Sequence, residues 1–179
     1  MDKSGQNAGA LSIGSTTDLL TYALALESEA SERYAELADQ MRTHNNTDVA
    51  ELFQEMSRIE QLHVDSVLEL AASFDVQDIS ARTYRWEEPD GPETTDMGEA
   101  HYLMTPHHAL RLALHNEKRA QEFFAKIAAE ATDNELVLLA TEMAAEEQEH
   151  VALMEAWVAR YPQPADDWAD DPDPAIGRD

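Results

Sequence analysis

Glu60-Gln-Leu-His63 and Glu147-Gln-Glu-His150 are the two stretches that decide how this chain folds. The first begins 33 residues after Glu27, and the second begins 30 residues after Glu117. On a helix, residues i and i+3 point to the same side, so each Glu-x-x-His pair offers one carboxylate and one imidazole to a common point. Together with the two single glutamates, the pairs supply six ligands, which is enough for two metal ions in the centre of a four-helix bundle.

The sequence repeats itself around these motifs. Adding 90 to the residue numbers carries the pattern of the first segment onto the third, and adding 87 carries that of the second onto the fourth. A repeated helix pair cannot bury its apolar face alone, so we expect two helical hairpins packed against each other. The matching positions are Leu20, Ala23, Glu27, Ala30 and Tyr34 with Leu110, Ala113, Glu117, Ala120 and Phe124, and Glu55, Met56, Glu60 and His63 with Glu142, Met143, Glu147 and His150.

A single Glu-x-x-His pair usually lies on the solvated surface of a helix, so the register of these pairs matters. Residues that alternate three and four apart form an apolar seam in each segment, and all six candidate ligands fall on these seams. This spacing predicts side chains that face the bundle interior. The four series are Leu20, Ala23, Glu27, Ala30, Tyr34, Leu37 and Met41; Leu52, Met56, Glu60, His63, Val67 and Leu70; Leu110, Ala113, Glu117, Ala120, Phe124 and Ile127; and Leu139, Met143, Glu147, His150, Met154 and Trp157.

Burial of four carboxylates requires compensation of their charge. They would repel one another and lose hydration at a cost of several kcal/mol each. Protonation is one solution, and pairing with cations is another, but no Lys or Arg falls on the seams. Two divalent ions cancel four negative charges, and neutral histidines complete the coordination. Mixed carboxylate and imidazole ligands suit iron or manganese, and zinc can compete.

The chain divides into three parts. Capping residues predict helix starts at Ser15, Asp48, Thr105-Pro106 and Thr132. We therefore expect one all-α bundle over residues 15–161, after a flexible N-terminus at 1–14 and before an acidic, proline-rich and disordered tail at 162–179. The long connection over 76–103 reads as a crossover along the bundle, packed down by Tyr84, Trp86 and Tyr102.

The motifs resemble those of the ferritin-like diiron carboxylate superfamily. The chain is most similar to the rubrerythrin diiron domain, over roughly residues 17–160, in the stretches Ala25–Tyr34 and Met104–Phe124 and in the two Glu-x-x-His pairs. The resemblance implies a ferritin-like bundle of two duplicated hairpins that binds two iron ions, with manganese or zinc as substitutes. It implies the ligands Glu27, Glu60, His63, Glu117, Glu147 and His150, and Tyr34 as a functional tyrosine beside the site.

Two departures from the rubrerythrin pattern affect the expected activity. Ala120 stands where rubrerythrins commonly carry a further glutamate, so the six ligands resemble a bacterioferritin-type centre and a peroxidase of the rubrerythrin type is placed in doubt. Rubrerythrins also often carry a rubredoxin module with four cysteines, and this chain has no cysteine. Electrons would then come from an external donor such as a rubredoxin-like protein. The resemblance favours a homodimer over a ferritin cage.

Composition sets the cellular context that we expect. Residues 1–15 lack the basic and apolar regions of a signal peptide, and no apolar run is long enough for a membrane span, which favours a cytoplasmic protein without a membrane anchor. A formal net charge of −25 opposes binding to nucleic acid. His101, His107, His108 and His115 could mark a path for iron, but the more common role of such residues is polar surface. We expect Glu146 and Glu149 to face solvent.

Three classes of function are consistent with the sequence. The first is an oxidoreductase that reduces hydrogen peroxide or O₂ in oxidative-stress defence. The second is a ferroxidase or iron-handling protein, in which the same centre oxidises Fe²⁺. The third is a metal-binding bundle without catalytic turnover. The sequence favours the first class and leaves the other two open.

Overall fold

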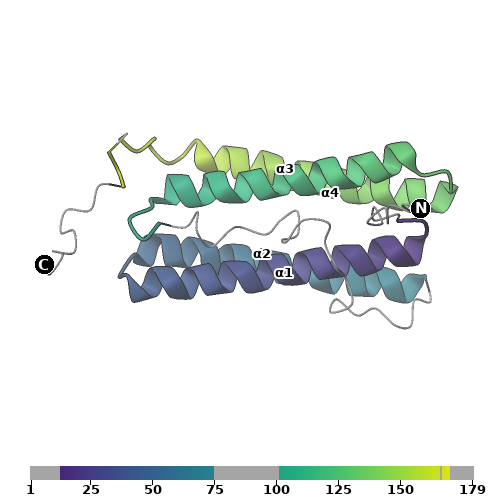
Figure 1. Ribbon diagram of the computed structural model, residues 1–179, viewed down its shortest axis with the longest axis horizontal. Coiled ribbons are helices and arrows are strands. Elements are labelled where there is room, and N and C mark those ends of the chain that lie inside the picture. The colour runs from purple at the N-terminus through teal and green to yellow at the C-terminus, as the bar shows by residue number, and fades with distance from the viewer. Residues whose placement is uncertain (1–12, 75–100, 166, 170–179) are drawn as a thin grey trace, which may run out of the picture.

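The computed structural model describes residues 13–74, 101–165 and 167–169. Over these residues it contains four helices and no strand: α1 (Thr16–Thr43), α2 (Thr47–Ser73), α3 (Pro106–Glu130) and α4 (Asn134–Val158) (Figure 1). The prediction of an all-α four-helix bundle is confirmed.

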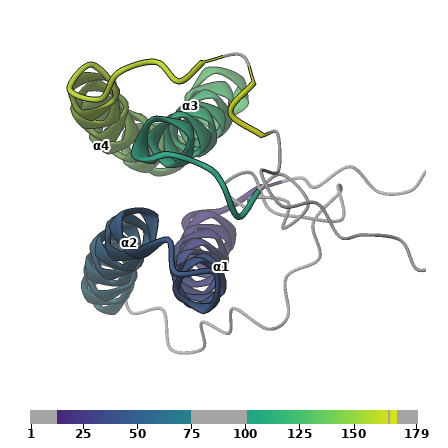
Figure 2. The same ribbon diagram turned by 90° about the vertical axis from the view of Figure 1, so that its left-hand side faces the viewer.

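The helices form two hairpins, α1 with α2 and α3 with α4. Seen end-on, α3 lies over α1 and α4 lies over α2 (Figure 2). The helix backbones approach closely within each hairpin, whereas between the hairpins close backbone approaches are few and involve only α2 with α3 and α1 with α4. The two hairpins therefore meet mainly through side chains.

Two apolar cores fill the bundle, one on each side of its middle. One core takes buried residues from the start of α1 and the end of α2, including Leu20 and Val67, and the other takes residues from the opposite halves, including Leu37 and Phe53. Each fully buried side chain of this size contributes about 1.5–3 kcal/mol by leaving water. The glutamates of the predicted site occupy the layer between these cores, so apolar packing on both sides fixes their position along the helices.

Two of the four helices, α1 and α3, begin after the predicted capping residues Ser15 and Thr105, whereas α4 is capped by Asp133, one residue after the predicted Thr132. The Ser15 hydroxyl accepts a hydrogen bond from the Asp18 backbone N–H at 3.1 Å, and a carboxylate oxygen of Asp133 accepts one from the Leu136 N–H at 2.9 Å. These bonds satisfy backbone donors that have no partner within the helix. Pro106 occupies the first position of α3, where its missing N–H is not needed.

The start of α2 differs slightly from the prediction. The helix begins at Thr47 rather than Asp48, and the preceding Asn46 makes no capping hydrogen bond with its side chain. Its amide group instead donates to the carbonyl oxygens of Tyr102, at 3.2 Å, and Met104, at 2.7 Å. Asn46 thus ties the turn between α1 and α2 to the segment that leads into α3.

Parts of the predicted connection and tail lie outside the described residues. Tyr84 and Trp86 are among them, whereas the ring of Tyr102 packs 5.3 Å from that of His44. In the tail, Trp168 lies 3.8 Å from the ring of His108 and packs against an apolar core. The domain limits at residues 14 and 161 remain predictions. In the part of the chain that is described, no helix is long and apolar enough to cross a membrane.

The two hydrogen bonds of Asn46 should contribute measurably to stability. We expect Asn46→Ala to lower the free energy of unfolding by about 1–2 kcal/mol, because two carbonyl groups lose their donor. Denaturant unfolding measures this change. Asn134→Ala, at an exposed first position of α4, serves as the control and should change stability by less than about 0.5 kcal/mol. Equal effects of both substitutions would contradict the role of Asn46.

Candidate metal centre

The structure brings the six predicted residues together in the middle of the bundle. Each hairpin supplies one group of three: Glu27 of α1 joins Glu60 and His63 of α2, and Glu117 of α3 joins Glu147 and His150 of α4. The four glutamates are 3–5% exposed, and the histidines are partly buried. The apolar seams identified in the sequence therefore do place these residues inside.

Within each group the imidazole lies against both carboxylates. His63 Nδ1 is 3.0 Å from Glu60 Oε2 and 3.3 Å from Glu27 Oε2. The second group repeats this arrangement, with His150 Nδ1 at 3.1 Å from Glu147 Oε2 and 3.5 Å from Glu117 Oε2. In each group one oxygen or nitrogen atom per residue lies within 4.8 Å of the others, which is close enough for the three atoms to share one metal ion.

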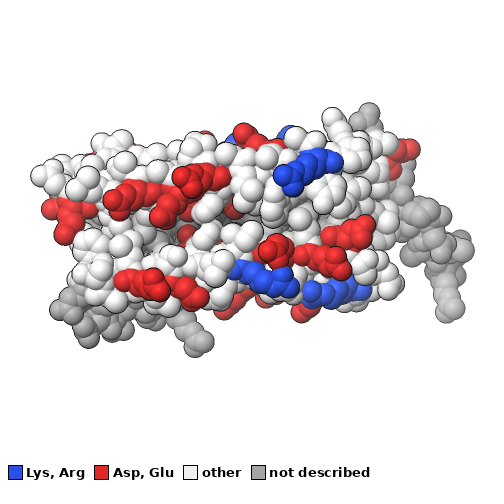
Figure 3. All heavy atoms as spheres, turned by 180° about the vertical axis from the view of Figure 1, so that it is seen from behind, with Lys and Arg blue, Asp and Glu red and all other residues white. Residues whose placement is uncertain are grey.

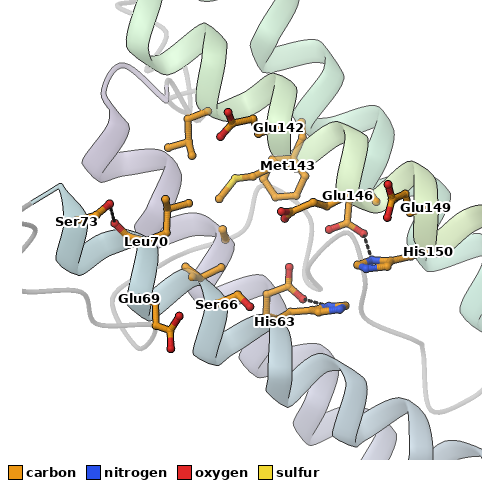
Figure 4. A pocket seen from close by; sticks show the side chains of 16 residues that line it. His63, Ser66, Glu69, Leu70, Ser73, Glu142, Met143, Glu146, Glu149 and His150 are labelled. Atoms are coloured by element: carbon orange, nitrogen blue, oxygen red, sulfur yellow. Dashed lines mark hydrogen bonds and ion pairs between the residues drawn. The ribbon is translucent and has the colours of Figure 1, made fainter.

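The two groups face each other across the hairpins. The rings of His63 and His150 stack with centroids 4.2 Å apart and planes inclined by 7° (Figure 4). The negative charge of Glu147 also raises the pKa of Glu27, and that of Glu117 raises the pKa of Glu60, so each pair is close enough to interact across the hairpins. The groups thus form one continuous polar layer, and two ions held there would be neighbours.

Burial dominates the protonation of the carboxylates. It raises the pKa of Glu27 and of Glu60, against the opposing effect of hydrogen bonding by His63. Burial likewise raises the pKa of Glu147 to about 7, where hydrogen bonding by His150 opposes it and the charge of Glu117 adds to it. The ionised form of these groups is therefore unfavourable without a cation beside them.

The pKa values of the two histidines are raised, although burial alone would lower them. Burial lowers the pKa of His63, but hydrogen bonds and charges from Glu27 and Glu60 outweigh it and raise the pKa to about 11. Burial and the charge of His63 lower the pKa of His150, yet Glu117 and Glu147 raise it to about 10. In the metal-free protein each histidine is thus a cation at neutral pH, and a metal ion must displace these protons to bind.

The donor set fits a pair of divalent ions. Glu27 Oε2 is buried and forms no well-directed hydrogen bond with the described residues, although His63 Nδ1, which is closer to Glu60, lies 3.3 Å away. Such a buried, unsatisfied carboxylate oxygen is costly unless a cation approaches it. Two sets of two carboxylates and one imidazole each offer the hard and intermediate donors that first-row transition metals accept. The two groups could therefore hold two metal ions.

Tyr34 lies buried beside this layer in contact with a residue that the sequence reading missed. Its hydroxyl oxygen accepts a hydrogen bond from the Asn116 side chain at 3.2 Å, and its ring stacks with that of Phe53. Asn116 directly precedes Glu117 and is 2% exposed. The internal repeat could have revealed Asn116. The equivalent position in the first hairpin, 90 residues earlier, is the apolar Leu26, so a buried polar residue at position 116 departs from the repeat.

The remaining candidates lie outside the two groups. Glu146 and Glu149 are exposed, yet both line a pocket that reaches the centre. Of the histidines considered as a path for iron, none belongs to either group of three, as far as the described residues go. His107, His108 and His115 instead line a separate pocket beside Trp168, and His101 packs against Trp168 as well.

A four-helix bundle with two Glu-x-x-His pairs and two single glutamates in its core has the architecture of the ferritin-like carboxylate metal proteins. Within this class, the family model described as rubrerythrin matches residues 18–158. The chain belongs to the rubrerythrin family.

A solved structure provides a second comparison. The chain is similar to an uncharacterised conserved protein from Magnetospirillum magnetotacticum MS-1, with 40% sequence identity and a TM-score of 0.61. The similarity covers 84% of this chain and 98% of the other. No curated protein matches the sequence.

The protonation of the centre predicts how the stability of the metal-free protein depends on pH. The raised pKa values of His63 and His150 stabilise the fold fully below about pH 6.5 and progressively less as the pH rises toward about 10 to 11. Ionisation of buried Glu147 acts in the same direction up to about pH 7. We expect the urea midpoint of metal-free protein to fall between about pH 6 and pH 9.

Two single substitutions test this assignment. His63→Gln should weaken the pH dependence, because it removes one of the protonated imidazoles, whereas His115→Gln, at an exposed position outside the groups, should leave it unchanged. A midpoint that is constant with pH in the metal-free wild type would contradict the proton distribution described above.

Proposed function

We propose that Glu27, Glu60, His63, Glu117, Glu147 and His150 bind two iron ions, and that the protein is a diiron oxidoreductase that reduces hydrogen peroxide or O₂. The observation that carries this proposal is the pair of facing Glu-Glu-His groups in the buried centre of the bundle. Four carboxylates balance the charge of two divalent ions, and membership of the rubrerythrin family supports iron, with manganese and zinc as substitutes.

The proposed ligands would come from both helices of each hairpin. Glu27 and Glu117 come from the first helix of each hairpin, whereas each Glu-x-x-His pair spans one turn of the second helix and so holds its two donors rigidly. Bound iron would supply the electrons that reduce the oxidant. Reduction of one hydrogen peroxide to two water molecules takes two electrons and two protons. The 179 residues contain no cysteine, so we propose an external electron donor, such as a rubredoxin-like protein.

Tyr34 would act as a positioning residue rather than as a ligand. It holds Asn116 by a hydrogen bond, and Asn116 is the neighbour of Glu117 in α3. Tyr34 would thus help to fix the backbone that carries this carboxylate. A homodimer and a cytoplasmic location complete the proposal and are supported only by the family resemblance and the composition.

Ferroxidase activity or iron handling is the second candidate. The observation in its favour is the group of acidic side chains around the pocket that reaches the centre, because carboxylates attract Fe²⁺ as a substrate. A bundle that binds metal without turnover is the third candidate, and no contact in the described residues favours it specifically.

Loss of one Glu-x-x-His pair should remove metal. We expect Glu60→Gln combined with His63→Gln to reduce the iron bound under anaerobic conditions from two ions per chain to one or fewer, since one of the two groups loses two donors. Elemental analysis after gel filtration measures the content. The matched control is Glu51→Gln with His115→Gln, which changes exposed residues of the same types. Unchanged iron content in the first variant would refute the assigned ligands.

The oxidant and the iron capacity separate the candidate functions. Protein loaded with two equivalents of Fe²⁺ should be oxidised faster by hydrogen peroxide than by O₂ and should turn over again after reduction. Stopped-flow absorbance measures both rates. Uptake and oxidation of many more than two irons per chain would instead favour the ferroxidase, and iron that reacts with neither oxidant would favour the bundle without turnover.

A further inference from the structure

A pocket of about 580 Å³ opens between α2 and α4 and reaches the metal centre. Glu27 and Glu147, which are nearly inaccessible, line its inner end together with the two histidines of the centre, which Figure 4 labels. This explains why His63 and His150 remain about one-fifth exposed while the four glutamates are nearly inaccessible. The pocket therefore connects the two groups with solvent on this side of the bundle.

The outer part of the pocket carries four further glutamates. Glu69 comes from α2, and Glu142, Glu146 and Glu149 come from α4, so acidic side chains stand on both walls (Figure 4). All four are exposed. None of the described residues that line the pocket is a Lys or Arg. The outer edge of the pocket is thus negative, whereas its inner end holds the protonated histidines that an arriving metal ion would deprotonate.

Acidic side chains lie along both edges of the pocket on this face of the molecule. In Figure 3 they border both sides of a hollow between α4 above and α2 below, and the basic side chains of this face lie in its other half. Apolar residues form much of the wall between the outer and inner carboxylates, including Val67, Leu70 and Met143. Walls of low polarity concentrate the field of nearby charges and raise the local concentration of cations.

The inner end offers an independent sign of a cationic ligand. Glu27 lines the pocket and is 4% exposed, and its Oε2 atom forms no well-directed hydrogen bond with the described residues, although His63 Nδ1 lies 3.3 Å away. A carboxylate oxygen left in this state is a strong acceptor for a cation that has lost part of its hydration. The pocket therefore runs from exposed carboxylates to a buried carboxylate that a metal ion can neutralise in place of the proton on His63.

We propose that this pocket is the route by which divalent metal ions reach the centre, and that Glu69, Glu142, Glu146 and Glu149 collect the ions at its outer edge. The proposal rests on metal binding by the two groups and adds the direction of approach. The four outer glutamates would set the rate at which metal ions are taken up, and the six inner residues would set the affinity of the centre for these ions. Neutral oxidants would pass the same carboxylates without attraction.

Stopped-flow mixing of the metal-free protein with Co²⁺ tests the route, because absorbance of the bound ion reports uptake without any redox step. We expect Glu69→Gln with Glu142→Gln to slow association about threefold, and the variant with all four outer glutamates changed to Gln to slow it about tenfold. The amount of Co²⁺ bound at saturation should stay at two per chain, since the six inner residues are retained. The differences should shrink at high salt, which screens the outer charges.

The control is Glu51→Gln with Glu122→Gln, which removes two exposed charges that do not line the pocket. It should associate at nearly the wild-type rate. Wild-type uptake by the variant with four substitutions, or equal slowing in the control, would overturn the route while leaving the metal site intact. Failure of the wild type itself to bind Co²⁺ would refute the metal site and the route together.

Discussion

Four carboxylates buried in one layer of the bundle dominate the energetics of this protein. Glu27, Glu60, Glu117 and Glu147 lie between two apolar cores, where water cannot screen their charges. The metal-free protein meets this constraint with protons, which it holds on the histidines and on some of the carboxylates. Divalent ions meet it better, because two of them neutralise all four carboxylates and leave the histidines neutral as ligands.

This constraint also explains how the two hairpins are joined. Each hairpin packs tightly by itself, and few close backbone approaches link one hairpin to the other. Each hairpin also carries a complete Glu-Glu-His group, and the groups meet at the stacked rings of His63 and His150. Metal ions bound in the layer would replace the protons that now compensate its carboxylates and would lie between the two hairpins, so they would stabilise this interface. Metal binding and packing of the hairpins are therefore expected to be thermodynamically linked.

The sequence predicted those features that follow from helical period and local capping. The seams placed all six residues inside because a spacing of three and four residues keeps a side chain on one helix face. The period says nothing about partners on other helices, so the bond between Asn116 and Tyr34 was missed. Asn46 was missed for a related reason, since its side chain bonds to carbonyl groups 56 and 58 residues away instead of capping its own helix. The pocket depends on the gap between α2 and α4, which no single helix determines.

A buried metal site faces two opposing requirements. The ligands must be removed from water to bind firmly, yet the ions must be able to reach them. The seams of α2 and α4 meet both requirements, because in each helix the glutamate of the motif points inward and the histidine, one turn later, lies at the edge of the pocket. The three-residue spacing of Glu-x-x-His rotates the histidine slightly around the helix relative to the glutamate. The same motif that encloses the carboxylates therefore leaves an opening on one side, and the outer glutamates lie around that opening.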